Sequence, residues 1–381
     1  MHVVVLGGGY AGVAAVRRLE HLLPADVDLT LATDTPDHVL QHELHRVLRR
    51  PAVANDLVVP LTQATDRTRI RVATVDGLDR ENRTVSLSSG TLAYDYCVVC
   101  LGTQTAFHGL ESVRERATPV KRIRHALAIR DEFRTVLDAT TGSVRIVVGG
   151  AGLSGVQVAG ELAALANAWD AGERTTVTLL EQRSRVAPNL PARFGEAIAS
   201  TLAETGIDVR TEATVTGADD TAVELEGDGA IPYEQLVWTG GIRGTDTMAA
   251  DRPRVGPDLR LDEHTFVCGD AAQIEDTTGQ LVPASAQSAR RAARTAATNV
   301  ARLIERDRTG TPTDTAELAQ FHFTSPGWVV SVGDDAVATI GSRILTGNPA
   351  KTAKAAVSAR YLLELGERRA AARLARLEVG G

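Results

Sequence analysis

Two stretches of the chain share one pattern of apolar and polar positions. In each, a short run of aliphatic residues leads into a glycine-rich turn, and apolar residues then recur at helical spacing. The first stretch covers residues 3–23 and the second covers residues 145–168. Short apolar runs that end at glycines are typical of buried parallel strands. The pattern therefore predicts two strand–turn–helix units.

Both turns have the same glycine spacing. They read Gly7-x-Gly9-x-x-Gly12 and Gly150-x-Gly152-x-x-Gly155. In this motif the first glycine makes a tight turn, the second lets backbone amides approach a pyrophosphate, and the third lets the helix pack on the strand. The phosphates then lie at the helix N-terminus, where unpaired N–H groups favour negative charge. Two copies of the motif predict two bound dinucleotides and electron transfer between them.

A second repeat supports a duplicated unit. An aromatic–acidic pair that begins at Tyr94 opens an apolar run ending at Gly102, and a similar pair at Tyr233 opens a run ending at Gly241. Each run reads as a strand that closes one copy of the unit. The chain therefore carries two copies of one α/β unit.

The second strand of each unit is expected to end near an acidic residue that binds a ribose hydroxyl. In the second unit this residue is Glu181, whose charge would repel a 2′-phosphate and so favours NADH over NADPH. Arg183 and Arg185 lie nearby and favour the opposite choice. In the first unit Thr33 aligns with Glu181, and we predict that the next residue, Asp34, is the ribose ligand.

A helix is predicted over residues 37–48, and it would place three histidines on one face. These are His38, His42 and His45, at spacings of four and three residues. They are interpreted either as a metal site or as a polar helix face near a cofactor. No cysteine or carboxylate cluster completes a ligand set, so no metal is predicted.

Cys97 and Cys100 have the spacing of a redox-active C-x-x-C pair. Three residues along a strand span about 10 Å and point to opposite faces. A disulfide requires Cα atoms within about 7 Å. Both cysteines are therefore predicted to be packed core thiols. Of the three cysteines, Cys268 alone is a candidate to lie near a cofactor.

Composition and charge exclude several classes of protein. The net charge of −7 argues against a nucleic-acid partner. No apolar run approaches the roughly 18 residues that span a bilayer, and the N-terminus enters a strand directly, so a cytoplasmic location is expected. Residues 351–381 hold seven Lys/Arg and three Asp/Glu in an amphipathic helical pattern interrupted at Gly366. This basic stretch is interpreted either as a membrane-docking surface or as a contact with a sister subunit.

These motifs resemble those of the FAD-dependent pyridine nucleotide-disulphide oxidoreductases, and within them the type II NADH:quinone oxidoreductases. The resemblance spans nearly the whole chain. It rests on the two glycine motifs, on Tyr94–Tyr96 with Leu101–Gly102, and on Ala159–Leu162, Gly269–Ala271 and Pro283–Gln287. It implies an α/β fold of two Rossmann-like, three-layer ββα dinucleotide-binding domains, the first interrupted by the second, and a small C-terminal α+β region.

The resemblance also implies the domain limits and the ligands. Residues 1–112 and 252–316 would bind FAD, residues 113–251 would bind NADH, and residues 317–381 would serve dimerisation or membrane docking. The implied cofactor-binding residues are Gly7, Gly9, Tyr10, Ala11, Gly12, Asp34, Gly102, Gly150, Gly152, Gly155, Glu161, Glu181, Gly241, Gly269, Asp270 and Ala286.

The helix that opens after Pro283 is expected, by resemblance, to pass the flavin ring and to border a quinone channel. Gln287 and Arg291 on this helix would orient the quinone, and Gln157 would lie near the nicotinamide and the flavin. Two of these catalytic candidates depart from the family pattern. The family often has Glu at the position of Gln157 and a second Gln at the position of Arg291.

The resemblance thus predicts an enzyme that passes hydride from NADH to FAD and two electrons on to a quinone. It would act as a possible homodimer or as a peripheral protein on the inner face of the cell membrane. Three other functions stay open. They are a soluble NAD(P)H-dependent flavoprotein reductase with a ferredoxin-like acceptor, a sulfide:quinone reductase with cysteines beside the flavin, and a sensor flavoprotein without turnover.

Overall fold

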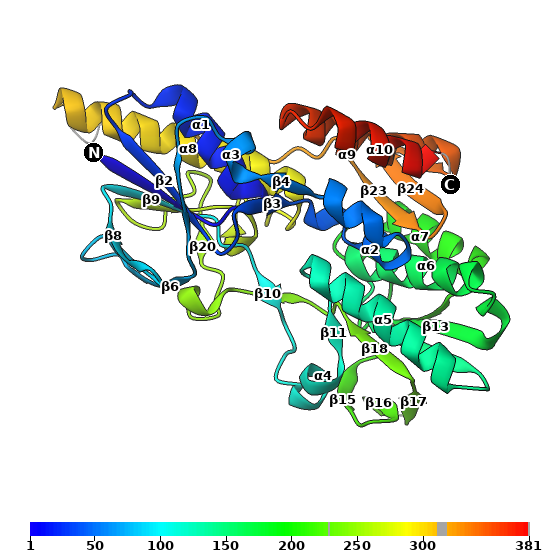
Figure 1. Cartoon of the computed structure of the whole chain (residues 1–381). Coiled ribbons are helices and arrows are strands. Elements are labelled where there is room, and N and C mark those ends of the chain that lie inside the picture. The colour runs from blue at the N-terminus through cyan, green and yellow to red at the C-terminus, as the bar shows by residue number, and fades with distance from the viewer. Residues whose placement is uncertain (228, 311–317, 380–381) are drawn as a thin grey trace. The chain divides into compact units, whose positions relative to one another are not determined.

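The computed structural model describes residues 1–227, 229–310 and 318–379 (Figure 1). The chain forms two compact units, each assembled from three separate segments. Unit 1 consists of Met1–Val39, Val58–Gln104 and Arg243–Thr324, and unit 2 consists of Leu40–Leu57, Thr105–Ile242 and Ser325–Gly381.

Unit 1 is built on a parallel five-stranded sheet with the order β21-β9-β1-β2-β5. Its strands are β1 (His2–Leu6), β2 (Asp28–Thr33), β5 (Arg69–Val72), β9 (Tyr96–Val99) and β21 (Thr265–Val267). The central strand β1 is apolar after His2, and Val3–Leu6 are fully buried. Helices α1 (Tyr10–Leu22) and α8 (Ala286–Thr309) pack side by side on this unit (Figure 1).

Shorter elements complete unit 1. The antiparallel meander β6-β7-β8 follows β5, and β3 pairs with β4. The bounds are β3 (Asp37–Val39), β4 (Val58–Pro60), α3 (Leu61–Ala64), β6 (Val75–Asp79), β7 (Thr84–Leu87), β8 (Gly90–Ala93), β20 (Arg254–Val255), β22 (Gln273–Ile274) and the 3-10 helices η4 (Asp246–Met248) and η5 (Gly269–Ala271). The chain leaves unit 1 in β10 (Gln104–Thr105) and returns in β19 (Ile242–Arg243).

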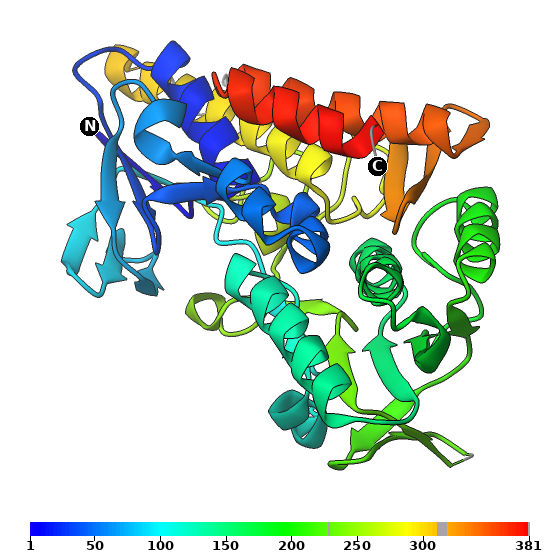
Figure 2. The ribbon, with the colours of Figure 1, turned by 45° about the vertical axis from the view of Figure 1, so that its right-hand side comes forward.

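Unit 2 repeats this plan with a parallel sheet of order β11-β18-β12-β13-β14 and a meander β15-β16-β17. Helices α5 and α6 pack on the sheet (Figure 2). The bounds are α4 (Glu111–Arg116), β11 (Thr118–Pro119), α5 (Ile123–Ala139), β12 (Val144–Gly149), α6 (Leu153–Ala168), η3 (Gly172–Arg174), β13 (Thr175–Leu180), α7 (Ala192–Glu204), β14 (Asp208–Arg210), β15 (Val215–Ala218), β16 (Ala222–Leu225), β17 (Ala230–Pro232) and β18 (Gln235–Trp238).

Two further parts of the chain belong to unit 2. One is a short segment with η1 (Gln41–Glu43), α2 (His45–Arg49) and η2 (Pro51–Asp56). The other is the C-terminal region, an antiparallel sheet β23-β24-β25 followed by two adjacent helices (Figures 1 and 2). Its bounds are β23 (Gly327–Val332), β24 (Asp335–Ile340), β25 (Arg343–Thr346), α9 (Asn348–Glu364) and α10 (Arg368–Val379). The two helices are separated at Gly366, whose φ of +87° suits glycine.

The predicted helix over residues 37–48 is wrong. Residues 37–39 form β3, because they pair with β4, a partner that lies about twenty residues further along the chain. His38 is buried in this strand, and its Nδ1 lies 2.9 Å from the carbonyl oxygen of Gly8. His42 and His45 instead lie in η1 and α2 of unit 2, so the three histidines do not share a helix face.

The units also differ from the limits that the resemblance implied. Residues 40–57 and 105–112 lie in unit 2, and residues 243–251 lie in unit 1. The C-terminal region clusters with unit 2 because β23 and β24 pack on α6 and α7. The predicted boundary after residue 316 falls outside the described residues.

Candidate dinucleotide-binding sites

The first glycine turn joins β1 to α1 in unit 1, and we call it the first cradle. Gly7 has a φ of +100°, and a Cβ atom there would collide with the carbonyl oxygen of Cys100. A Cβ atom on Gly12 would collide with the carbonyl oxygen of Gly7. A Cβ atom on Gly9, in contrast, would meet no heavy atom within 4 Å. Packing therefore requires the first and third glycines, whereas the second leaves open space against the backbone at the N-terminus of α1.

The second glycine turn joins β12 to α6 in unit 2, and we call it the second cradle. Gly150 has a φ of +95°, and its Cβ atom would lie 2.7 Å from the Cα atom of Gly240. A Cβ atom on Gly155 would collide with the carbonyl oxygen of Gly150, while one on Gly152 would meet nothing within 4 Å. The two cradles thus share one geometry. In both, backbone N–H groups at a helix N-terminus border open space, which is the arrangement that binds a pyrophosphate.

The acidic residues that follow the second strands differ between the units. Glu181 is buried, and its carboxylate accepts hydrogen bonds from the backbone N–H groups of Ala151 at 3.1 Å and Arg183 at 3.0 Å. It therefore lies directly at the second cradle. Asp34 is exposed at the end of β2. The guanidinium of Arg183 donates to Asn189 at 2.9 Å, so it is held by a protein partner.

The Gly269-Asp270 turn lies beside the first cradle. Gly269 has a φ of +67°, and its Cβ atom would lie 2.9 Å from the Cβ atom of Ala11 and 3.2 Å from that of Ala289. This close approach brings η5 against the first turn of both α1 and α8. The carbonyl oxygen of Asp270 accepts a hydrogen bond from Nε of Arg252 at 2.7 Å.

Helix α8 carries three of the predicted residues at its start. Ser285 caps the helix by accepting a hydrogen bond from the backbone N–H of Ser288 at 3.2 Å, and Ala286 is the first helical residue. Gln287 and Arg291 follow one helical turn apart, and the Arg291 guanidinium donates to the carbonyl oxygen of Thr324. Unit 1 therefore brings together the first cradle, the Gly-Asp turn and the start of α8. Gly102, with a φ of +66° and an open Cβ direction, belongs to the same unit.

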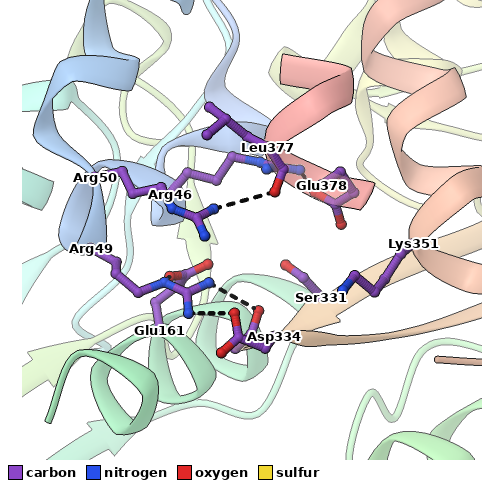
Figure 3. Close-up of a pocket in the computed structure, with 10 residues that line it drawn as sticks. Arg46, Arg49, Arg50, Glu161, Ser331, Asp334, Lys351, Leu377 and Glu378 are labelled. Carbon is purple, nitrogen blue, oxygen red and sulfur yellow. Dashed lines mark hydrogen bonds and ion pairs between the residues drawn. The ribbon is translucent and has the colours of Figure 1, made fainter. Parts of the chain in front are cut away.

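Unit 2 places the remaining predicted residues on or beside α6. Gly241 follows β18, and its Cβ atom would lie 2.7 Å from Nε2 of His108. The side chain of Gln157 lies 3.4 Å from Nε2 of His45. Glu161 is buried, and its carboxylate lies 2.9 Å from Nε of Arg49 (Figure 3). The structure thus places the carboxylate of Glu161 against the guanidinium of Arg49.

Glu161 belongs to a group of ionisable side chains inside unit 2 that the sequence did not predict. We call it the charged cluster, and its members are Glu43, His45, Arg46, Arg49, Glu161, Lys354 and Glu378. Arg46 forms ion pairs with Glu43 and Glu378. Arg49 pairs with Asp334 at 2.6 Å (Figure 3). Every member except Arg49 is buried. Buried charges persist only when they are paired in this way.

Lys354 is a buried cation of the charged cluster. Its Nζ lies 2.8 Å from Nε2 of His45 and donates to Oγ of Ser331 at 2.5 Å. Burial lowers the pKa of Lys354 to about 7, although the Glu43 carboxylate 3.9 Å away opposes the change. Burial also lowers the pKa of His45 well below its usual range, and the Lys354 cation adds to this effect.

The pKa values of two carboxyl groups in the charged cluster, Glu43 and Glu161, are shifted in opposite directions. Burial opposes the ionisation of Glu43, but Lys354 and Arg46 outweigh it and hold the pKa of Glu43 well below its usual value. Burial raises the pKa of Glu161, with Arg49 opposing. The cluster can therefore hold a proton on Lys354 near neutral pH, next to a neutral His45 and to Gln157. One signal for it was available, since Lys351 and Lys354 are two of only three lysines in the chain.

Comparisons with known proteins agree with this fold. The chain is 26% identical to the type II NADH:quinone oxidoreductase of Staphylococcus epidermidis, covering 96% of each protein. A solved structure of NDH2 from Plasmodium falciparum in complex with NADH matches with a TM-score of 0.84 at 15% identity, over 98% of this chain and 97% of the other. The sulfide:quinone oxidoreductase of Aquifex aeolicus matches with a TM-score of 0.79 at 20% identity, over 97% and 92%.

The two structural matches show the fold alone, which is an α/β fold with two Rossmann-like domains. The family of the chain is established by its match to a sequence model of one protein family. The model of the pyridine nucleotide-disulphide oxidoreductases matches residues 1–293, which include both cradles and the start of α8. The chain therefore belongs to the pyridine nucleotide-disulphide oxidoreductase family.

Proposed function

We propose that the protein is an FAD-dependent NADH dehydrogenase that oxidises NADH with a quinone. The observation that carries this proposal is the pair of glycine cradles, which share one geometry and lie one in each unit. The similarity to a type II NADH:quinone oxidoreductase over 96% of both chains supports the choice of donor and acceptor. FAD, when bound, supplies a two-electron carrier between the hydride donor and the quinone.

Unit 1 holds FAD in this proposal. The backbone amides at Gly9 to Gly12 receive the pyrophosphate, because the second glycine leaves their approach open. Gly269 and Asp270 line the same site, since their turn packs against Ala11. Gln287 and Arg291 extend from the start of α8 and orient the quinone.

Unit 2 holds NADH, and Gln157 lies beside its nicotinamide. The pyrophosphate meets the amides at Gly152 to Gly155, and the buried carboxylate of Glu181 lies beneath the cradle, where the second strand ends. Its negative charge disfavours a 2′-phosphate, so the enzyme prefers NADH to NADPH. Arg183 and Arg185 lie nearby and act against this preference, and their guanidinium groups are hydrogen-bonded to Asn189 and to the carbonyl oxygen of Pro188.

The charged cluster supplies the proton of the overall reaction. NADH, a proton and a quinone give NAD⁺ and a quinol, so each turnover takes up one proton. Gln157 cannot exchange a proton as a carboxylate would, but it lies 3.4 Å from His45, which lies 2.8 Å from Lys354. Because the pKa of Lys354 is about 7, this ammonium group can release a proton at neutral pH and take one up again.

We also propose that the protein works at the inner face of the cell membrane. No helix among the described residues combines the length and the apolar composition that crossing a bilayer requires. Helix α9 instead exposes Val357 and Leu363, each 54% exposed, close to Arg360. Such a surface suits docking on an anionic bilayer. Flotation with anionic vesicles tests this, and a homodimer that does not bind vesicles would contradict it.

One anaerobic titration tests the enzymatic proposal. The purified yellow protein should bleach when NADH is added and should recover its colour when a soluble quinone analogue follows. No bleaching would exclude NADH as the donor. Recovery with a ferredoxin-like protein but not with the quinone would make the protein a soluble reductase. Bleaching by sulfide instead of NADH would favour the sulfide:quinone reductase.

A further inference from the structure

Cys100 and Cys268 form a buried pair in unit 1, although they are 168 positions apart in the sequence. Their sulfur atoms lie 3.4 Å apart. Cys100 is 4% exposed and Cys268 is fully buried. Cys97, the remaining cysteine, lies three residues before Cys100 and is also fully buried. The spacing along one strand had excluded a bond between Cys97 and Cys100, but it said nothing of Cys268.

The backbone around this pair suits a disulfide bond. Cys100 directly follows β9, Cys268 directly follows β21, and these strands are parallel neighbours in which Val99 is opposite Val267. The backbone N–H of Cys268 donates to the carbonyl oxygen of Val99 at 3.1 Å, so the two strand ends remain paired. Neighbouring strands lie about 4.8 Å apart, within the Cα separations that disulfides tolerate. Bond formation therefore requires a small movement of the two side chains.

The pair lies directly behind the first cradle. The carbonyl oxygen of Cys100 is the atom that a Cβ on Gly7 would strike, and the Cβ of Cys100 would lie 3.7 Å from a Cβ on Gly12. Each cysteine is also followed directly by a residue that packs against the cradle, since a Cβ on Gly7 would lie 3.2 Å from the Cα of Leu101 and a Cβ on Gly269 would lie 2.9 Å from the Cβ of Ala11. Cys268 directly precedes Gly269, and Cys100 lies two residues before Gly102. A covalent bond between the sulfurs would fix the separation of the residues that follow the two cysteines.

We propose that Cys100 and Cys268 form a redox-controlled disulfide that cross-links the strand ends behind the first cradle. With a peroxide as oxidant, one thiol becomes a sulfenic acid and releases water. The other thiol displaces a second water from that sulfur and forms the S–S bond. Two thiols and one peroxide thus give one disulfide and two waters, and a dithiol reductant reverses the reaction. The bond should also make FAD harder to release from the first cradle. This effect rests on the proposed function, whereas the formation of the bond does not.

The surroundings of the pair determine the rate of this reaction. Burial raises the pKa of the Cys100 thiol, so the thiolate that attacks an oxidant is scarce. We therefore expect formation over hours rather than seconds. Once formed, the bond closes a loop of more than 160 residues and constrains the unfolded chain. Long loops gain the most from this constraint, so the melting temperature should rise by about 5–10 °C.

The test compares the flavin-loaded protein before and after incubation with hydrogen peroxide. After denaturation and alkylation, peptide mapping should find a Cys100–Cys268 linked peptide and one alkylated thiol at Cys97. Dithiothreitol should restore three alkylated thiols. Three alkylated thiols after prolonged exposure to peroxide, or fragmentation of the linked peptide that places the bond on Cys97 and the alkyl group on Cys100, would overturn the proposal.

The variants Cys97→Ala, Cys100→Ala and Cys268→Ala provide matched controls, because all three side chains are buried. Peroxide should raise the melting temperature and the temperature of FAD release in the wild type and in Cys97→Ala, but in neither of the other two. A bond that forms without changing FAD release would overturn the cradle part of the proposal. If the protein binds no FAD, the proposed function fails, while thiol counting and melting still test the bond. The wild-type mapping also stands if a variant does not fold.

Discussion

The two cradles of this chain share their glycines but differ in the residue behind the turn. In unit 2 this residue is Thr239, whose hydroxyl donates to the carbonyl oxygens of Gly149 at 2.9 Å and Gly150 at 2.8 Å. In unit 1 the aligned residue is Cys100, which makes a sulfur contact with Cys268 instead. The first and third glycines remain the same because steric collisions leave no alternative. The residue behind the turn, which we call the supporting position, has no such constraint. Unit 2 therefore holds its turn with the hydroxyl of Thr239, and unit 1 holds its turn with the packed thiol of Cys100.

The helices that leave the cradles differ more strongly. Helix α1 packs its apolar face against α8. Helix α6 carries Gln157 and Glu161 toward the charged cluster. The duplicated unit therefore keeps its nucleotide-binding turn, while the helix after the turn leads into the charged cluster in unit 2. Substitutions that add a methyl group at the cradle glycines should therefore affect both units alike. A change of pH should alter stability mainly through the charged cluster of unit 2.

The largest expected effect is at the third glycine of each cradle. Gly12→Ala should prevent FAD binding and cost about 3 kcal/mol of stability, because the new methyl group collides with the Gly7 carbonyl. Gly155→Ala should abolish reduction by NADH while FAD remains bound. Flavin absorbance per protein and thermal unfolding measure both. The matched controls Gly9→Ala and Gly152→Ala have open space, so they should keep wild-type stability and lose only nucleotide affinity. A stable, flavin-loaded Gly12→Ala protein would contradict the shared geometry.

The next largest effect concerns pH and Lys354. The folded pKa of about 7 lies below the unfolded value of 10.5, so between these values the unfolded chain binds more protons. The free energy of unfolding should therefore rise with pH between 7.5 and 9.5, by about 1 kcal/mol per pH unit from this group. Lys354→Met should lose this slope, as denaturant titrations at several pH values would show. The exposed Arg360→Met on the same helix serves as the control. An unchanged slope in Lys354→Met would exclude the assigned pKa.

A smaller effect is expected at the acidic residues after the second strands. Glu181→Gln removes the charge at the second cradle, so the ratio of kcat/KM for NADPH to that for NADH should rise about tenfold. The corresponding change in unit 1, Asp34→Asn, should leave this ratio unchanged and lower the FAD content instead, because Asp34 is the predicted ribose ligand of the first cradle. Steady-state kinetics with both nucleotides measure the ratio. An equal shift in the two variants would remove the distinction between the cradles.

The smallest effect is expected at the supporting position. Thr239→Val removes the hydroxyl that bonds two turn carbonyls, which should cost about 1 kcal/mol and raise KM for NADH. Thr239→Ser keeps the hydroxyl and should behave like the wild type. FAD content should not change in either variant. A KM for NADH that is the same in all three proteins would show that packing alone holds the second turn.

The sequence predicted those parts of the structure that depend on residues close together in the chain. These parts are the two strand–turn–helix units and the strand that precedes Gly269. The helix expected over residues 37–48 failed because β3 takes a distant partner, β4. The charged cluster stayed hidden because His45 and Lys354 are 309 residues apart. No periodicity or spacing rule reports such a contact, and the same holds for Cys100 and Cys268.

The segmented make-up of the two units has a consequence for biosynthesis. Each is completed only when its last stretch of chain is available, residues 243–324 for unit 1 and residues 325 onward for unit 2. A growing chain on the ribosome would therefore expose β1 long before β21 completes the sheet of unit 1. It would likewise expose β12 long before β23 packs on unit 2. Such non-local closure slows folding and prolongs the exposure of apolar strands. Nascent chains of this protein should accordingly depend on chaperones until translation is almost finished.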